Sequence, residues 1–266
     1  MAEDVVTSAR AAVLQTLFRA IQSYSATSCL AWLGSVPSEQ LLPIFRPRSN
    51  PAVNQFEAII AEHENREQLS IVMATYREQA DASAVAGTQS AIAAACLVFS
   101  HSLADVALEE LCSLLADFNP GYWTKIISKR SFTLGKIAER GVDELTKESV
   151  RQKIKSMSLP TKMKHLLKNA GSHANVDYPS FTYERSRLAK LDASRHAVVH
   201  DEGVTLRVDD TKDSQEFFFN TTVYAALVVS STLGLGVTYP QLYVRWLEHL
   251  AEQAGLPGVV NTLRSQ

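Results

Sequence analysis

A short segment near residue 195 combines residue types that handle phosphate and protons. Residues 195–200 read Arg-His-Ala-Val-Val-His, so His196 and His200 lie one helical turn apart, directly after Arg195. A histidine exchanges a proton near neutral pH, and a guanidinium pairs with phosphate oxygens. The apolar residues around the segment predict a helix that ends near it. The partial negative charge at a helix C-terminus favours a cationic imidazole there.

The same segment resembles the Arg-(polar)-x-x-x-His motif of the HEPN superfamily, with His196 in the polar position. The apolar run from Ala91 to Leu115 is similar to the first long helix of that family, and Asp105 would take its acidic position. The resemblance covers about residues 84–254. It implies an all-α bundle that forms a homodimer. In many members the motifs of two protomers make one composite active site.

The resemblance also implies a reaction, the metal-independent cleavage of RNA, including tRNA, by a toxin or anti-phage defence enzyme. It assigns catalysis to Arg195 and His200, with His196 in support and Asp105 holding Arg195. The RNA 2′-hydroxyl would be the nucleophile, His200 would move the proton, and Arg195 would stabilise the phosphate charge. The expected products are a 2′,3′-cyclic phosphate and a 5′-hydroxyl. No cofactor is expected, and an antitoxin or regulatory protein is an expected partner.

Positive charge gathers in one part of the chain. The segment from Lys125 to Lys168 holds twelve basic and four acidic residues, a net charge of +8 in a chain of net charge −2. Such a segment can attract a polyanion, although it is also typical of a solvated helix surface. The residues that we expect to contact the RNA backbone are Lys125, Lys129, Arg130, Lys153, Lys155, Lys162, Lys164 and Lys168.

Three other interpretations of residues 192–200 remain open. Asp192, His196 and His200 share a helix face and could bind a metal ion as in a hydrolase, although Ala197 replaces the glutamate of a His-Glu-x-x-His site. The chain could also be a helical interaction or regulatory module without catalysis. Finally, the two histidines could cap the carbonyl groups at the end of a helix.

Helical spacing of apolar residues dominates the chain and predicts a mostly all-α protein. Helices are expected at 5–24, 51–80, 84–118, 122–140, 143–157, 160–169, 179–201 and 239–254. Residues 215–233 are expected to form one helix or a strand and a helix. Apolar and polar residues alternate over 204–208, which allows a short β-hairpin near 204–219. A domain boundary is expected near Asp81, with an N-terminal helical region at 1–80 and a HEPN-like domain at 81–266.

Composition excludes several classes of protein. With 46% apolar and 20% charged residues the chain is not disordered, and 11 glycines exclude a collagen-like repeat. No secretory signal or membrane-spanning segment is expected, because the most apolar run, Ala91 to Phe99, is too short. Cys29, Cys96 and Cys112 are an odd number without close pairing, so no disulfide framework is expected. The sequence therefore predicts a cytoplasmic protein that does not bind membranes.

Overall fold

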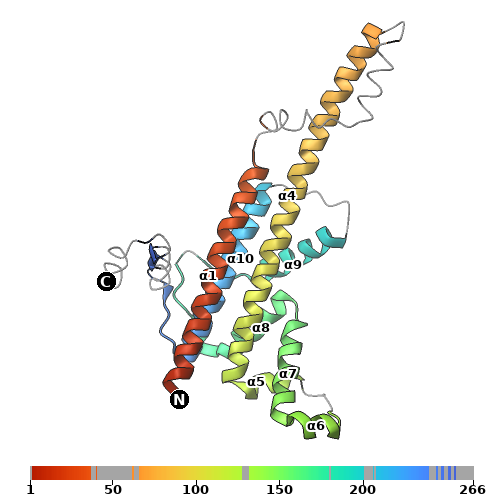
Figure 1. Ribbon diagram of the computed structural model, residues 1–266. Helices are drawn as coiled ribbons and strands as arrows, with labels where there is room; N and C mark the ends of the chain where they lie inside the picture. Colours follow the sequence, from red (N-terminus) through yellow and green to blue (C-terminus); the bar gives the residue numbers. More distant parts are fainter. Residues whose placement is uncertain are drawn as a thin grey trace.

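The chain folds into helices that differ greatly in length (Figure 1). The computed structural model describes residues 2–36, 40, 62, 66–127, 132–179, 181–200, 206, 208–239, 244, 247–248, 251–252 and 255. These residues contain no strand. The predicted all-α class is therefore confirmed.

Three long helices and several shorter ones follow one another along the chain. The α-helices are α1 (Ala2–Gly34), α4 (Arg66–Phe118), α5 (Pro120–Thr124), α6 (Leu134–Arg140), α7 (Val142–Lys155), α8 (Leu159–Ala170), α9 (Arg185–His200) and α10 (Val208–Leu233). Two 3₁₀ turns, η2 (Lys125–Ile127) and η3 (Gly171–Ala174), follow α5 and α8.

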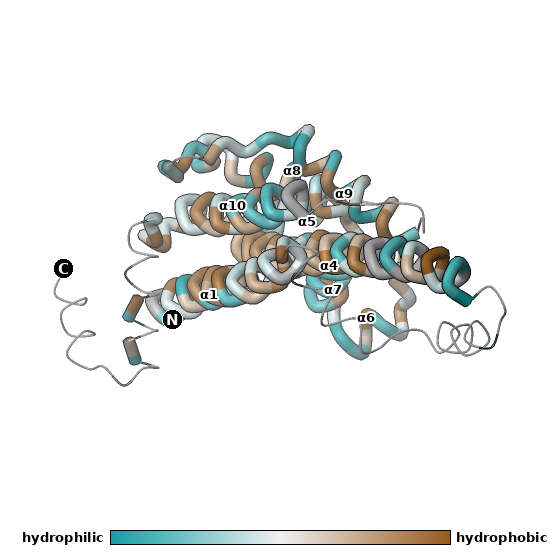
Figure 2. The backbone as a smooth tube through the Cα atoms, turned by 90° about the horizontal axis from the view of Figure 1, so that it is seen from above, coloured by the Kyte–Doolittle hydropathy of each residue, from teal (hydrophilic) through white to brown (hydrophobic). Residues whose placement is uncertain are grey.

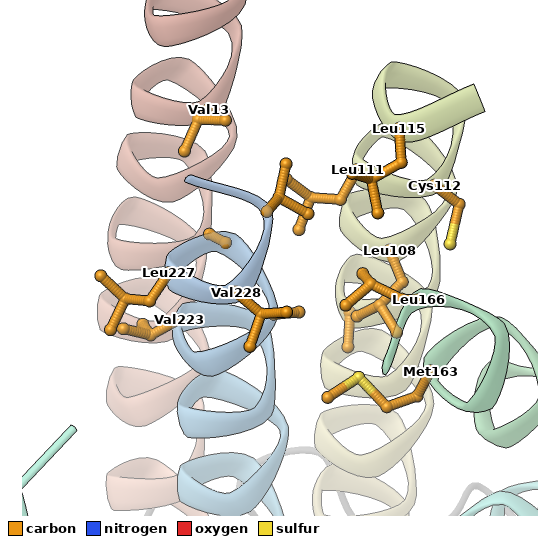
Figure 3. Packing of buried hydrophobic residues seen from close by; sticks show 14 of the residues in the cluster. Val13, Leu108, Leu111, Cys112, Leu115, Met163, Leu166, Val223, Leu227 and Val228 are labelled. Carbon is orange, nitrogen blue, oxygen red and sulfur yellow. The ribbon is translucent and has the colours of Figure 1, made fainter. Parts of the chain in front are cut away.

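The core lies where α1, α4 and α10 run side by side (Figures 1 and 3). Val223 and Leu227 of α10 point toward α1, while Val228 points toward α4 (Figure 3). Figure 2 shows hydrophobic and hydrophilic residues along both α1 and α10. Residues 221–230 of α10 are almost all buried, so this helix is covered on more than one side. On the other side of α4, Met163 and Leu166 of α8 are fully buried. Helix α9 packs against both α4 and α8.

Helix α4 runs without interruption from Arg66 to Phe118, 53 residues or about 80 Å. Its N-terminal part extends beyond the other helices (Figure 1). The boundary that we expected near Asp81 therefore falls inside one helix. The same core cluster takes Val13 and Leu17 from α1 and Leu108 from α4, so the N-terminal helix packs with the rest of the protein.

The predicted break between helices 51–80 and 84–118 is absent, because α4 continues through residues 81–83. Two other predicted elements are also wrong. Residues 122–140 do not form a single helix, because Phe132 and Thr133 are not helical and Thr133 precedes a new helix, α6. The part of the suggested β-hairpin from 208 to 219 lies in α10. Phe217 and Phe218 are buried while Phe219 is partly buried, so tertiary packing favours a helix where local sequence left the choice open. Residues 201–205 lie outside the described part of the chain.

One helix bears on the expectation that no segment spans a membrane. Val85–Phe118 is long and apolar enough to cross a membrane, by length and composition alone. The core helix of a soluble protein meets the same criterion. In this fold α1, α8, α9 and α10 all contact α4, which explains why its apolar residues are not confined to one stripe.

Candidate functional site

Helix α9 holds the segment singled out in the sequence. It begins at Arg185 and not near residue 179 as predicted, since residues 181–184 are not helical, and His200 is its last described residue. Leu188 is fully buried and anchors the helix, and Leu191 and Val198 pack against the core. Most of its other residues are accessible to solvent. The helix therefore presents polar side chains to an open surface, while a few apolar residues fix its position.

An open cleft of about 600 Å³ lies between α9, α4 and the connection from α7 to α8. The polar residues that line it include His101, Asp105, Ser158, Asp192, Arg195 and His196. The structure thus brings Asp105 to the same cleft as Arg195 and His196, although about ninety residues separate them in sequence. His200 is not among the lining residues and lies one turn further along α9.

Asp105 does not hold Arg195, contrary to our expectation. Its carboxylate Oδ1 lies 2.8 Å from Lys162 Nζ, and Glu109 Oε2 lies 3.6 Å from the same nitrogen. The Lys162 side chain has no exposed surface, so it is not available to RNA as the sequence suggested. These ion pairs between a buried lysine and two partly exposed carboxylates tie α8 to α4.

A second acidic residue of the cleft is paired with a histidine that sequence analysis passed over. His101 Nε2 lies 2.7 Å from Asp192 Oδ1, and the histidine packs edge-on against Phe218. His101 lies one helical turn before Asp105, so both residues share a face of α4. This spacing was the only feature of the sequence that could have linked His101 to the cleft. The pairing with Asp192 depends on how α9 docks.

Arg195 differs from these pairs because no hydrogen bond or ion pair joins it to another residue in the described part of the chain. The side chain is half-buried, and its Nε atom is buried without a hydrogen-bond partner. A guanidinium carries five N–H donors and is always charged at neutral pH. Arg195 is therefore a cation with unused donors at the edge of an open cleft.

His196 and His200 lie together on the outer surface of α9. Both are exposed, and their ring centroids are 4.4 Å apart with the planes inclined by 51°. His196 lines the cleft. The pair can therefore reach a ligand that enters from solvent.

Asp192 is not free to complete the metal site that the sequence suggested with His196 and His200. Asp192 is bound to His101. Within the described ranges no group of three or more histidine, cysteine, aspartate or glutamate residues is placed to hold a metal ion. A shared helix face does not bring the carboxylate to the two imidazoles, because neighbouring α4 offers it another partner.

The basic segment divides into exposed and paired cations. Lys125, Lys153, Lys155, Lys164 and Lys168 are exposed, while Lys129 and Arg130 lie outside the described residues. Arg140 pairs with Glu144 and Glu148, and Arg151 pairs with Asp117. Only part of the charge counted in the sequence is thus free to meet a polyanion.

Helices α7 and α8 gather three of the exposed lysines around His165. Burial lowers the pKa of His165, and the nearby charges of Lys164, Lys168 and Lys153 lower it further. A hydrogen bond of 3.0 Å joins His165 Nδ1 and the Tyr122 hydroxyl. The lowered pKa favours the neutral imidazole, so the local positive charge comes mainly from the lysines.

The three cysteines are free thiols. Cys96 and Cys112 are buried, as expected of small core residues, and Cys29 is exposed. Burial raises the pKa of the Cys112 thiol far above its usual value, so it stays protonated. None of the three lines the cleft.

Comparison of the chain with protein-family models, with curated proteins and with solved structures gave no match. What the protein does has to be inferred from the site itself.

Proposed function

We propose that the α4–α9 cleft binds the phosphate groups of RNA and that the protein cleaves RNA without a metal ion, as the HEPN-like motif implies. The observation that carries this proposal is the guanidinium of Arg195, whose Nε is buried without a partner and which pairs with no other residue that the structure describes. The two carboxylates of the cleft, Asp105 and Asp192, are already bonded to Lys162 and His101. Arg195 therefore keeps its charge for an anion that comes from outside.

Two further features favour an anionic ligand. Helix α9 carries Arg185, Arg187, Lys190 and Arg195 against one acidic residue, so its side chains bear a net charge of +3. Ser158 and Leu159, at the N-terminus of α8, line the cleft. The dipole of α8 favours negative charge at this end, although Pro160 has no N–H group and the N–H groups of Thr161 and Lys162 donate to the Ser158 carbonyl oxygen.

The reaction that fits these residues is an attack by the RNA's own 2′-hydroxyl on the adjacent phosphorus. The 2′-oxygen forms a bond to phosphorus, and the bond from phosphorus to the 5′-oxygen breaks. His200 exchanges the protons of these two oxygens, with His196 beside it, while Arg195 offsets the charge on the phosphate. The exposed lysines of α7 and α8 would hold the flanking backbone. Pairing of two copies would bring a second motif to the same phosphate.

The test is cleavage of total RNA and of tRNA by purified protein in the presence of EDTA. We expect Arg195→Ala and His200→Ala each to lower the rate by roughly 100-fold or more. Lys190→Ala is the matched control, since Lys190 is an exposed cation of α9 that does not line the cleft. The products should carry cyclic phosphate and 5′-hydroxyl ends.

Cleavage that requires a metal ion, or that both variants retain, would contradict the proposal. RNA binding that depends on Arg195 without cleavage would instead support a non-catalytic RNA-binding module. The proposed role as a toxin or defence effector, with an antitoxin as partner, is tested separately. Expression in cells should be toxic, and His200→Ala should relieve the toxicity.

A further inference from the structure

The paired histidines at the end of α9 have a chemistry that does not depend on RNA. His196 and His200 are one turn apart, exposed, and have ring centroids 4.4 Å apart. In the described residues neither imidazole has a hydrogen-bonding partner. Two accessible imidazoles at this spacing are the arrangement in which helical histidines share one metal ion.

We propose that His196 and His200 form a two-histidine chelate for a divalent transition metal, with Zn²⁺ as the ion to test. A tetrahedral zinc with bonds of about 2.0–2.1 Å needs two nitrogens roughly 3.3 Å apart. The ring centroids lie 4.4 Å apart with planes inclined by 51°, so both side chains must turn until one nitrogen of each ring faces a common point. Water or another small ligand completes the coordination, because Asp192 is bound to His101.

The position on the helix favours a cation for a second reason. His200 is the last described residue of α9, and the sequence predicts that the helix ends close to it. Unpaired carbonyl groups at a helix C-terminus carry partial negative charge, which stabilises positive charge beside them. This field partly offsets the repulsion from the basic residues of α9.

The chelate is separate from the proposed RNA cleavage but uses the same histidines. Bound zinc would occupy the nitrogens that the proposed reaction needs for proton transfer, so zinc would inhibit cleavage if cleavage occurs. The binding measurement requires no RNA. Failure of the nuclease proposal therefore leaves this test unaffected.

The experiment is calorimetric titration of ZnCl₂ into the full chain, freed of any affinity tag and treated with chelator. We expect one zinc ion per chain. Loss of outer partners of a metal ligand already costs about 10–100-fold in affinity. We therefore expect His196→Gln and His200→Gln each to weaken binding by at least about tenfold and the double variant to abolish this site.

His173→Gln is the matched control, since His173 is an exposed histidine on η3, away from α9. It should bind zinc as the wild type does. All variants should keep the wild-type thermal midpoint in the absence of zinc, because the substituted side chains are exposed. No zinc binding by the wild type, or unchanged binding by the double variant, would overturn the proposal. An anomalous-scattering peak between the two imidazoles in zinc-soaked crystals would confirm it directly.

Discussion

Lys162 and Arg195 lie on two helices beside the same stretch of α4, but their environments are opposite. Lys162 has no exposed surface and pairs with Asp105 and Glu109. Arg195 lies at an open cleft and pairs with no residue in the part of the chain that the structure describes. A buried cation with partners serves the fold, whereas a cation without partners at a cleft is free to serve a ligand. The following predictions test this division of roles.

Lys162→Ala should give the largest change. The substitution leaves Asp105 and Glu109 without their shared cation, and it leaves a gap where the buried side chain lay. We therefore expect the free energy of unfolding to fall by about 3 kcal/mol. Urea denaturation measures the change. Lys164→Ala, an exposed lysine of the same helix, should shift stability by no more than about 0.5 kcal/mol. Equal effects of the two substitutions would remove the distinction between buried and exposed cations.

The Asp192 carboxylate should contribute less to the stability of the fold than Lys162 does. Its pairing with His101 joins α9 to α4 at 2.7 Å, and Asp192 is partly exposed. Asp192→Ala should lower the free energy of unfolding by about 1–2 kcal/mol, the usual effect of losing a hydrogen bond to a charged group. Denaturation is again the measurement, with Lys190→Ala as the exposed control on α9. A loss below about 0.5 kcal/mol would mean that the pair does not fix the position of α9.

Arg195→Ala should separate function from stability. We expect a stability change within about 0.5–1 kcal/mol, because no partner in the described structure is left behind. Affinity for single-stranded RNA should fall, and the slope of log affinity against log salt concentration should decrease by about 0.7 for one lost phosphate contact. Binding isotherms at several salt concentrations test this. A large loss of stability with an unchanged slope would make Arg195 a structural residue.

The smallest expected effect concerns His165. Its pKa is lowered by burial and by Lys164, Lys168 and Lys153, so the folded state prefers the neutral imidazole. This contribution to stability is complete above the unfolded pKa of about 6.5 and is lost as the pH falls toward the folded value. Lys168→Met should raise the pKa of His165 in an NMR titration. Substituting Lys125, which is not among the charges acting on His165, should leave that pKa unchanged.

Much of the fold follows from the pattern of apolar residues. Local signals predicted both the end of α4 at Phe118 and the separation of α7 from α8. Such signals depend on residues close together in the chain, so they can be recognised before the tertiary contacts are known. The Phe217–Phe219 run was undecided, because a row of aromatic residues suits a strand as well as a buried helix.

The candidate site also contains residues that the sequence predicted and residues that only the tertiary structure identified. The sequence identified Arg195, His196 and His200, because their spacing along one helix is a local property. It missed His101, misassigned the partner of Asp105, and counted Lys162 among the surface cations. Each of these errors concerns a residue whose role depends on a helix far away in the chain.

The sequence by itself thus determined the all-α class, the helix that carries the arginine and the two histidines, and the positive charge of residues 125–168. Only the tertiary structure decided which charged side chains form ion pairs within the protein. Lys162 and Lys164 are two residues apart on one helix, yet one is buried against two carboxylates and the other is exposed. The reason is that helical periodicity places neighbouring residues on different faces, and only the packing of α8 against α4 selects the face that meets Asp105.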